Sequence, residues 1–246
     1  MKMIENNKWF EGTEQLIGKN GIQKLKKSHI LIAGLGGVGA FAAEMLCRAG
    51  IGTLTIIDGD YFTASNRNRQ IGALCSTEGF AKTEVMKNRL LDINPEININ
   101  TICEYIKDER QKEILKLYPY TYVIDAIDTL SPKVFFIINT LHYNLKLVSA
   151  MGAGGKLDPS RICVTDISES YECRLAYKLR KKLHLLGITT GFDVVFSDEK
   201  VPRNVIIPNK STPNKNSSVG TISYMPAIFG STCASVVIRN ILKDNS

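Results

Sequence analysis

Paired cysteines are missing from this sequence. It contains six cysteines, but no two of them are separated by only two residues. Common structural zinc sites use such C-x-x-C pairs, so the spacing argues against a cysteine-based zinc site. The apolar neighbours of most of these residues predict buried thiols in a reducing compartment, which favours a cytoplasmic protein. The cysteines are Cys47, Cys75, Cys103, Cys163, Cys173 and Cys233.

Clustered histidines and an N-terminal apolar segment are absent as well. His29, His142 and His184 lie far apart and are predicted to have structural roles. Residues 1–20 carry charges throughout, so they indicate neither a secretory signal nor an anchor. Residues 219–238 lack charge and are long enough to span a bilayer, but their glycine, serine, threonine and proline content favours a buried C-terminal helix. We therefore expect no membrane association.

Length and charge place the chain among ordinary α/β proteins. Its 246 residues are enough for one large domain with a substantial core. The 31 Lys and Arg residues exceed the 24 Asp and Glu residues, which gives a net charge of +7. This excess favours a polyanionic partner without requiring one.

Strand and helix patterns alternate over the first two thirds of the chain. This order predicts a Rossmann-like, doubly wound, mostly parallel sheet. Beyond residue 152 two strand patterns suggest an extension by antiparallel strands. We expect one domain over 1–246, with N-terminal helices in 1–28, a core in 29–152, and the extension and C-terminal helix in 153–246. The first expected strand runs up to Gly34, and the others cover 53–58, 97–106, 122–127, 145–152, 162–167 and 192–197. The expected helices cover 13–27, 38–49, 79–93, 108–117, a segment that begins at 131, and 174–186.

A glycine-rich turn follows the first expected strand. Gly34, Gly36 and Gly39 have G-x-G-x-x-G spacing, which lets a strand turn sharply into a helix whose N–H groups face a phosphate. Asp58 closes the next strand, where a carboxylate can accept hydrogen bonds from a ribose. Such turns also occur without a ligand, but the order of strand, glycines, helix and acid indicates a nucleotide site.

Cations and amides crowd the segment after Asp58. Asn66, Arg67, Asn68 and Arg69 lie within four positions, and an arginine fork there can stabilise charge on an α-phosphate. A dinucleotide dehydrogenase has no particular need for them. Lys82 is a further candidate cation, although a lysine in such a helix is by itself more typical of a solvated surface.

Two aspartates end the fourth expected strand. Asp125 and Asp128 lie at the carboxyl edge of the sheet, where ligands of open α/β folds bind. Asp128 is suited to hold Mg²⁺ against phosphates, whereas Asp125 is a candidate brace for the loop. Residues 208–218 lack apolar side chains and are either a linker or a substrate-contacting flap.

These motifs together resemble a known family. The stretches G-L-G-G-V-G (34–39), I-I-D-G-D (56–60), S-N-R-N-R-Q (65–70), G-F-A-K (79–82) and V-I-D-A-I-D (123–128) are similar to the adenylating enzymes that include the ubiquitin-activating enzymes and the activators of bacterial sulfur-carrier proteins. Members of that family use ATP and Mg²⁺ to convert a carboxylate into an acyl-adenylate. The resemblance covers most of the chain.

Within that family the sequence is most similar to the bacterial tRNA threonylcarbamoyladenosine dehydratases. The similar stretches are I-D-A-I-D-T-L-S-P-K (124–133), M-G-A-G-G-K-L-D-P-S-R-I (151–162) and V-F-S-D-E-K (195–200). The resemblance implies that ATP activates the threonyl carboxylate of threonylcarbamoyl-adenosine in tRNA, and that the carbamoyl group then closes a ring. AMP leaves, and the net result is loss of water.

The resemblance also implies roles for individual residues. It assigns Asp58 to the ribose, Arg69 and Lys82 to the phosphates and the transition state, and Asp128 to Mg²⁺. The implied catalytic residues are Arg69, Lys82 and Asp128. Asn66 and the loop of Gly34, Gly36 and Gly37 would line the ATP site. It further implies a homodimer and, in some members, a sulfur-relay partner.

The N-terminal segment departs from the family. Relatives commonly carry arginines ahead of the first strand, and one of them can reach the ATP of a partner subunit. Here Trp9 and Gln15 stand in that stretch, and Lys8 or Lys19 offers no bidentate fork.

Three other functions compete with the leading one. An activator of a sulfur-carrier or ubiquitin-like protein would use the same first half-reaction, but the C-x-x-C zinc ligands common in those relatives are missing. A non-catalytic binding module would fit the N-terminal change, but Arg69, Lys82 and Asp128 are retained. An NAD dehydrogenase would leave the 65–69 segment and Asp128 without a role.

Overall fold

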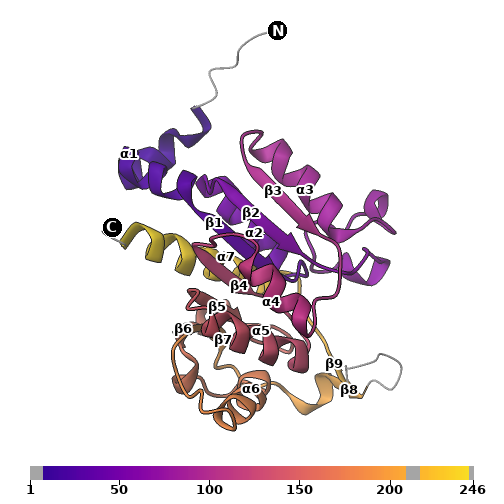
Figure 1. Cartoon of the computed structure of the whole chain (residues 1–246). Coiled ribbons are helices and arrows are strands. Elements are labelled where there is room, and N and C mark those ends of the chain that lie inside the picture. The colour runs from indigo at the N-terminus through magenta and orange to yellow at the C-terminus, as the bar shows by residue number, and fades with distance from the viewer. Residues whose placement is uncertain (1–7, 209–216, 244–246) are drawn as a thin grey trace.

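A twisted seven-stranded sheet forms the centre of the molecule. The computed structural model describes residues 8–208 and 217–243, and its sheet has the order β3-β2-β1-β4-β5-β7-β6 (Figure 1). All neighbouring strands are parallel except β6, which runs antiparallel to β7. The chain reverses its direction of winding between β1 and β4, so the carboxyl ends of these strands form the topological switch point where ligands of such folds bind. The strands are β1 (His29–Ala33), β2 (Thr53–Ile57), β3 (Asn98–Ile102), β4 (Tyr122–Asp125), β5 (Leu147–Ala150), β6 (Ile162–Asp166) and β7 (Asp193–Ser197).

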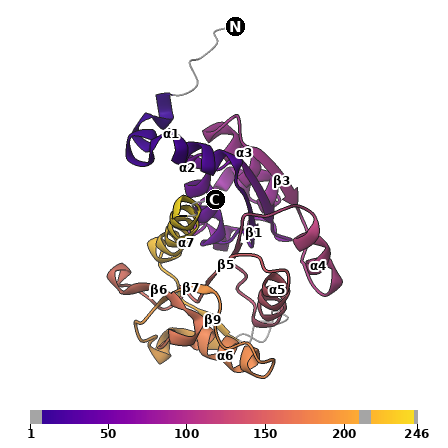
Figure 2. The ribbon, with the colours of Figure 1, turned by 60° about the vertical axis from the view of Figure 1, so that its left-hand side comes forward.

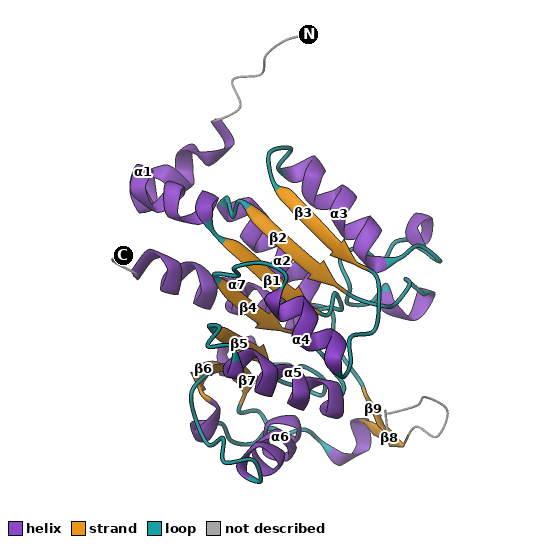
Figure 3. Ribbon diagram, viewed as in Figure 1, coloured by secondary structure: helices purple, strands orange, loops and turns teal. Residues whose placement is uncertain are grey.

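Helices cover both faces of this sheet and bury two apolar clusters (Figures 2 and 3). Apolar residues on one face of each strand pack against one helix layer, and those on the other face against the second. The first layer holds α1 (Glu11–Lys27), α2 (Gly39–Ala49), α3 (Lys82–Ile93) and α7 (Tyr224–Lys243); the second holds α4 (Glu109–Lys116), α5 (Leu130–His142) and α6 (Arg174–His184). Short 3₁₀ helices are η1 (Lys8–Phe10), η2 (Ala64–Asn66), η3 (Cys75–Thr77), η4 (Pro159–Arg161), η5 (Ile167–Glu169) and η6 (Arg203–Val205).

The C-terminal helix α7 belongs to the core. Among the described helices it alone is long and apolar enough to cross a membrane, and half of its most apolar window is buried. It packs closely on α2, because Gly230 brings its backbone so near that a Cβ there would lie 2.3 Å from the Val38 carbonyl oxygen. The prediction of a buried C-terminal helix is confirmed.

The C-terminal extension differs in part from the expectation. Only β6 is antiparallel within the sheet, whereas β7 runs parallel to β5. The strand β6 brings the chain back to the edge where β7 begins, since Asp166 at its end pairs with Asp193 at the start of β7. A separate antiparallel hairpin joins β8 (Ile206–Pro208) and β9 (Ser217–Val219). The predicted loop 208–218 lies mostly outside the described residues.

Two element boundaries and the cysteine burial also differ. The helix predicted over 79–93 starts only at Lys82, since Gly79 has a φ of 85° and Ala81 forms a β-bridge with Tyr61. The strand predicted over 97–106 stops at Ile102. The expectation that most cysteines are buried is wrong, because only three of the six free thiols are buried. Cys75 in η3 and Cys103 directly after β3 are exposed, and Cys163 in the edge strand β6 is half-buried.

Candidate nucleotide-binding site

The glycine turn lies where the sequence places it, between β1 and α2. Gly34 has a φ of 93°, a conformation that favours glycine, and a Cβ there would lie 2.7 Å from the Ala126 carbonyl oxygen. A Cβ on Gly39 would lie 1.8 Å from the Gly34 carbonyl oxygen. These two positions admit only glycine, because the helix must begin directly against the strand that feeds it. The turn therefore opens at the carboxyl edge of the sheet with the first amides of α2.

Asp58 connects this turn to the end of β2. Its Oδ2 accepts a hydrogen bond from the Leu35 amide at 2.6 Å, and its Oδ1 accepts one from the Asp60 amide at 2.8 Å. Burial raises the pKa of the Asp58 carboxyl, while nearby Lys82 and the two amides act in the opposite direction. A carboxylate has further acceptor positions, so the same group can brace the turn and still accept a bond from a ribose hydroxyl.

Lys82 is buried, which differs from the solvated surface lysine that its helix position alone would indicate. Its side chain is 5% exposed, and its Nζ lies 2.7 Å from Asp60 Oδ2 and 3.7 Å from Asp58 Oδ1. The hydroxyl of Tyr105, from the loop after β3, donates to the other oxygen of Asp60. Asp60 and Tyr105 were given no role from the sequence, although Asp60 lies only two residues after Asp58 in D-G-D. Together they hold the ammonium group beside the nucleotide turn.

The arginine segment packs directly on the glycine turn. A Cβ at Gly37 would lie 2.9 Å from the Arg69 carbonyl oxygen and 2.8 Å from Pro226 Cβ at the start of α7. Asn68 donates to the Thr221 carbonyl oxygen at 3.1 Å, which links the same segment to the chain ahead of α7. Three segments distant in sequence thus meet at one point.

Within this segment the two arginines have different surroundings. Arg67 pairs with Glu78 at 3.4 Å and donates to the Cys75 Sγ at 2.7 Å. Arg69 is half-buried and donates to the Ser65 carbonyl oxygen at 3.0 Å and to Asn68 Oδ1 at 2.8 Å. Asn66 accepts from the Thr63 amide at 3.1 Å, so its side chain caps the turn that carries both arginines. Arg69 is thus held within its own segment and, unlike Arg67, has no carboxylate partner among the described residues.

Gln70 is a further polar residue at this point that had no predicted role. Its side chain is buried, and its Oε1 accepts no hydrogen bond from any residue that the structure describes. Its Nε2 lies 4.0 Å from the place that a Cβ on Gly36 would take. A buried amide oxygen without a partner is costly, so this atom is a candidate for a bond to a bound ligand. Its place in S-N-R-N-R-Q is the one signal in the sequence.

Asp125 and Asp128 have separate roles in the structure. Asp125 is fully buried, pairs with Lys133 at 2.7 Å, and accepts from Ser149 at 2.6 Å and from the Ile127 amide at 3.1 Å. It braces the loop after β4, as expected, and Lys133 adds a bond to the Ile127 carbonyl oxygen. Asp128 is exposed at the end of this braced loop, at the same edge as the glycine turn.

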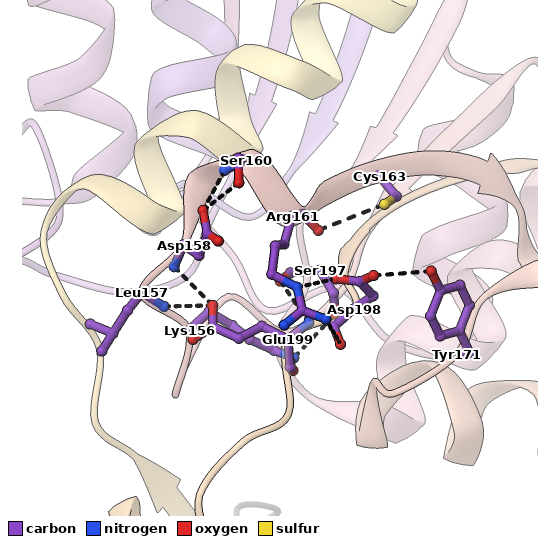
Figure 4. Close-up of polar contacts among 10 residues, drawn as sticks. All are labelled: Lys156, Leu157, Asp158, Ser160, Arg161, Cys163, Tyr171, Ser197, Asp198 and Glu199. Carbon is purple, nitrogen blue, oxygen red and sulfur yellow. Dashed lines mark hydrogen bonds and ion pairs between the residues drawn. The ribbon is translucent and has the colours of Figure 1, made fainter.

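The loop after β5 is fastened to the end of β7 (Figure 4). The Glu199 carboxylate accepts from the Leu157 amide at 2.8 Å and from the Asp158 amide at 2.9 Å. Buried Lys156 donates to the Ser197 carbonyl oxygen at 3.1 Å, and burial lowers the pKa of this lysine. These contacts fix a second wall at the carboxyl edge.

The altered N-terminal residues lie outside this set of contacts. Trp9 is partly exposed in η1 and stacks on Phe10, with ring centroids 3.5 Å apart. Gln15 and Lys19 are exposed on α1, whose end feeds the amino end of β1. Neither of them is brought to the glycine turn of its own chain.

Comparison with known proteins gives full-length matches. Residues 12–246 match the ThiF family. The chain is 36% identical to the tRNA threonylcarbamoyladenosine dehydratase of Bacillus subtilis, with 96% of this chain and 95% of that protein covered. It is 35% identical to the protein of the same name from Escherichia coli, with 98% and 97% covered.

Solved structures agree with these matches. The E. coli tRNA N6-threonylcarbamoyladenosine dehydratase in complex with ATP has a TM-score of 0.87 and 34% identity to this chain, with 98% of this chain and 97% of that one covered. The same enzyme with AMP also has a TM-score of 0.87. The family match and the two relatives rest on nearly the whole sequence, and the structural match on nearly the whole fold. The chain belongs to the ThiF family.

Proposed function

We propose that this protein is an ATP-dependent enzyme that cyclises threonylcarbamoyl-adenosine in tRNA with loss of water. The observation that carries the proposal is the convergence of Lys82 and the Arg69 segment on the glycine turn at the switch point of the sheet. Relatives named for this reaction match over nearly the whole chain, which supports the choice of substrate.

The site accounts for the first half-reaction. The amides that begin α2 and the cations of Arg69 and Lys82 bind the triphosphate, while Asp58 accepts a bond from the ribose. The threonyl carboxylate oxygen attacks the α-phosphorus, and the bond to the β-phosphate oxygen breaks, so pyrophosphate leaves. Both cations stabilise the negative charge that builds up on the phosphoryl oxygens.

The second half-reaction needs no nucleophile from the protein. The carbamoyl group attacks the activated carbonyl carbon of the same substrate, the bond to the AMP oxygen breaks, and the carbamoyl group loses a proton. Holding both groups in one bound substrate makes this step intramolecular. One ATP becomes AMP and pyrophosphate, and the oxygen that leaves the substrate is carried away in AMP.

Asp128 would hold Mg²⁺ in this scheme. The described residues contain no cluster of three or more His, Cys, Asp or Glu side chains that could form an all-protein metal site. The single carboxylate of Asp128 is compatible with Mg²⁺, which proteins often bind through one or two carboxylates while phosphates and waters supply the remaining ligands. The ion would neutralise phosphate charge during the displacement.

A sulfur-carrier activator is the second candidate. A Candida glabrata adenylyltransferase and sulfurtransferase is 33% identical, but the match covers 66% of this chain and 36% of that protein. The full-length matches favour the tRNA substrate. We further propose a cytoplasmic homodimer, in which the changes at Trp9 and Gln15 weaken any contact with the partner's ATP, and a sulfur-relay protein as an optional partner.

Mass spectrometry of nucleosides tests the function directly. Purified protein is incubated with ATP, Mg²⁺ and tRNA that carries open threonylcarbamoyl-adenosine, and the digested nucleosides are weighed. The expected result is the loss of one water from that nucleoside, dependent on ATP. Unchanged tRNA, together with release of pyrophosphate in the presence of a small protein ending in Gly-Gly, would favour the second candidate instead.

A further inference from the structure

Helix α6 carries an unusual stripe of positive charge. Residues 174–184 read R-L-A-Y-K-L-R-K-K-L-H, with five Lys or Arg and no Asp or Glu. Its buried side chains, Ala176, Leu179 and Leu183, attach one face to the sheet. The opposite face presents an exposed set at positions i, i+3, i+4, i+7 and i+8, which forms one continuous row. This basic stripe consists of Arg174, Tyr177, Lys178, Lys181 and Lys182.

The cations of the basic stripe are not neutralised. None of the four forms an ion pair with any residue that the structure describes. Three arginines on other helices are paired: Arg48 and Arg89 both pair with Glu44, at 2.9 and 2.6 Å, and Arg110 pairs with Glu104 at 2.7 Å. These four charges therefore form no ion pair that would stabilise the described part of the fold.

Arg180, on the same helix, shows the contrast. It is half-buried, and its guanidinium donates to the carbonyl oxygen and the hydroxyl of Ser170, so it fastens the helix to the segment before it. It has a structural partner and lies outside the stripe. Helix α6 therefore carries one arginine with a structural partner, Arg180, and a separate row of cations without one among the described residues.

The basic stripe begins at the same edge of the sheet as the glycine turn, near the ends of β5 and β7. The Leu175 Cβ lies 3.9 Å from the place of a Cβ on Gly152, which follows β5 at the carboxyl edge. Tyr171, just ahead of α6, donates to Asp198 at 3.0 Å, directly after β7 at the same edge (Figure 4). From there α6 runs along the outside of the sheet for about 16 Å. The row of charges therefore leads away from the reaction edge across the surface.

An exposed aromatic lies within the row. Tyr177 is 61% exposed, although tyrosine is a large apolar side chain whose burial would stabilise the fold. Cations that meet phosphates, interleaved with an aromatic on which a base can stack, are the pattern of nucleic-acid surfaces.

We propose that the basic stripe docks the sugar–phosphate backbone of the tRNA substrate while the modified base occupies the site. The proposal rests on the proposed function, which supplies the tRNA. The lysines contact successive phosphates without reading sequence, and Tyr177 stacks on an unpaired base next to the reacting one. The stripe then holds the RNA in register and leaves the chemistry to the residues at the glycine turn.

Charge reversal on the stripe tests the proposal. The variant Lys178→Glu/Lys182→Glu is compared with Lys27→Glu/Lys116→Glu, which changes net charge equally at exposed lysines that end α1 and α4. We measure tRNA binding over a salt series and the KM and kcat of ring closure. The expected result for the α6 pair is about tenfold weaker binding, a salt slope reduced by about two, a raised KM for tRNA and a kcat within about twofold of wild type.

A second variant separates stacking from charge. Tyr177→Ala is expected to weaken tRNA binding by about fivefold without changing the salt slope. The docking proposal is overturned if the Lys178→Glu/Lys182→Glu variant binds tRNA as tightly as wild type, or if both double variants weaken binding equally. The first of these outcomes would favour an acidic protein as the partner of the stripe instead. A wild-type protein that binds tRNA with the expected salt dependence but does not convert it would contradict only the proposed function.

Discussion

Two arginines that are neighbours in sequence are expected to contribute unequally. The backbone carbonyl of Arg69 lies against the glycine turn at Gly37, whereas the Arg67 side chain is paired with Glu78. Arg69→Ala should reduce pyrophosphate release by about 30-fold or more, equivalent to about 2 kcal/mol in transition-state stabilisation. Arg69→Lys should lose most of this as well, because a lysine keeps the charge without the bidentate fork.

Arg67→Ala is the matched control for this prediction. It removes the same side chain two positions away, and pyrophosphate release should stay within about threefold of wild type. Circular dichroism confirms that each variant is folded. Equal losses in Arg67→Ala and Arg69→Ala would contradict the assignment of the phosphate contact to Arg69.

The residues at the site could be selected from the sequence only in part. The glycines and Asp58 follow fixed spacings from strand ends, so local pattern was enough to name them. Local pattern pointed only to the segment 66–69, and the resemblance selected Arg69 within it. Lys82 was recognised by resemblance, while its burial against Asp60 depends on a contact between positions 22 residues apart. Tyr105 and Lys133 acquire their partners Asp60 and Ala150 only when the chain folds, and Gln70 is buried in the same way, so no spacing rule reports these features.

One buried carboxylate ties helix α2 to helix α3. Glu44 is 3% exposed and pairs with Arg89 of α3 and with Arg48 of its own helix. Glu44→Gln should lower the free energy of unfolding by about 1–3 kcal/mol at pH 7, measured in urea. Glu113→Gln, which breaks a pair on the surface with Arg110, should change it by less than about 0.5 kcal/mol.

The effect of Glu44 should depend on pH in a defined direction. Burial raises the pKa of this carboxyl, but the hydrogen bonds from Arg89 and Arg48 outweigh it, so the pKa lies below its ordinary value of 4.5. The stabilisation is therefore complete above that value and is lost as the pH falls through the folded-state pKa. The difference between wild type and Glu44→Gln should shrink when the urea titration is repeated at about pH 3.5. A difference that grows in acid would refute this sign.

The contact of α7 with α2 allows no added atom. A Cβ on Gly230 would lie 2.3 Å from the Val38 carbonyl oxygen and 3.0 Å from the Ala42 amide, and backbone atoms of a helix cannot yield locally. Gly230→Ala should destabilise the protein by about 2 kcal/mol or more, even though alanine favours the helical backbone. Gly12→Ala on α1, where nothing lies within 4 Å, should be neutral or slightly stabilising. Equal melting temperatures for the two variants would disprove the close contact.

Elements with strong local patterns were predicted better than their ends and pairings. The alternating strands and helices up to β5 were expected in the observed order. Boundaries failed where a tertiary contact decides them, as at Ala81, which bridges to Tyr61 before α3 begins. The antiparallel extension is present as the β6–β7 pair, but the parallel pairing of β7 with β5 was not predicted, because a strand pattern does not state which neighbour it will pair with.

The nucleotide site exists only when distant parts of the molecule meet. The glycine turn, the arginine segment and the start of α7 converge at Gly37, so a ligand bound there must stabilise the whole fold. ATP at 100 times its Kd should contribute about 2.7 kcal/mol, and for a chain of this size each kcal/mol raises the melting temperature by about 2–4 °C.

A substitution at Gly37 should therefore reduce the rise in melting temperature that ATP causes. In Gly37→Ala the added Cβ would lie 2.9 Å from the Arg69 carbonyl oxygen and 2.8 Å from Pro226 Cβ. The glycine turn, the arginine segment and the start of α7 must then move apart, which disrupts the nucleotide site. We expect differential scanning fluorimetry to show less than half of the wild-type rise with ATP for Gly37→Ala, and the full rise for Gly12→Ala. A full rise in Gly37→Ala would mean that ATP is held without this convergence, since a site built on one segment alone would tolerate the change.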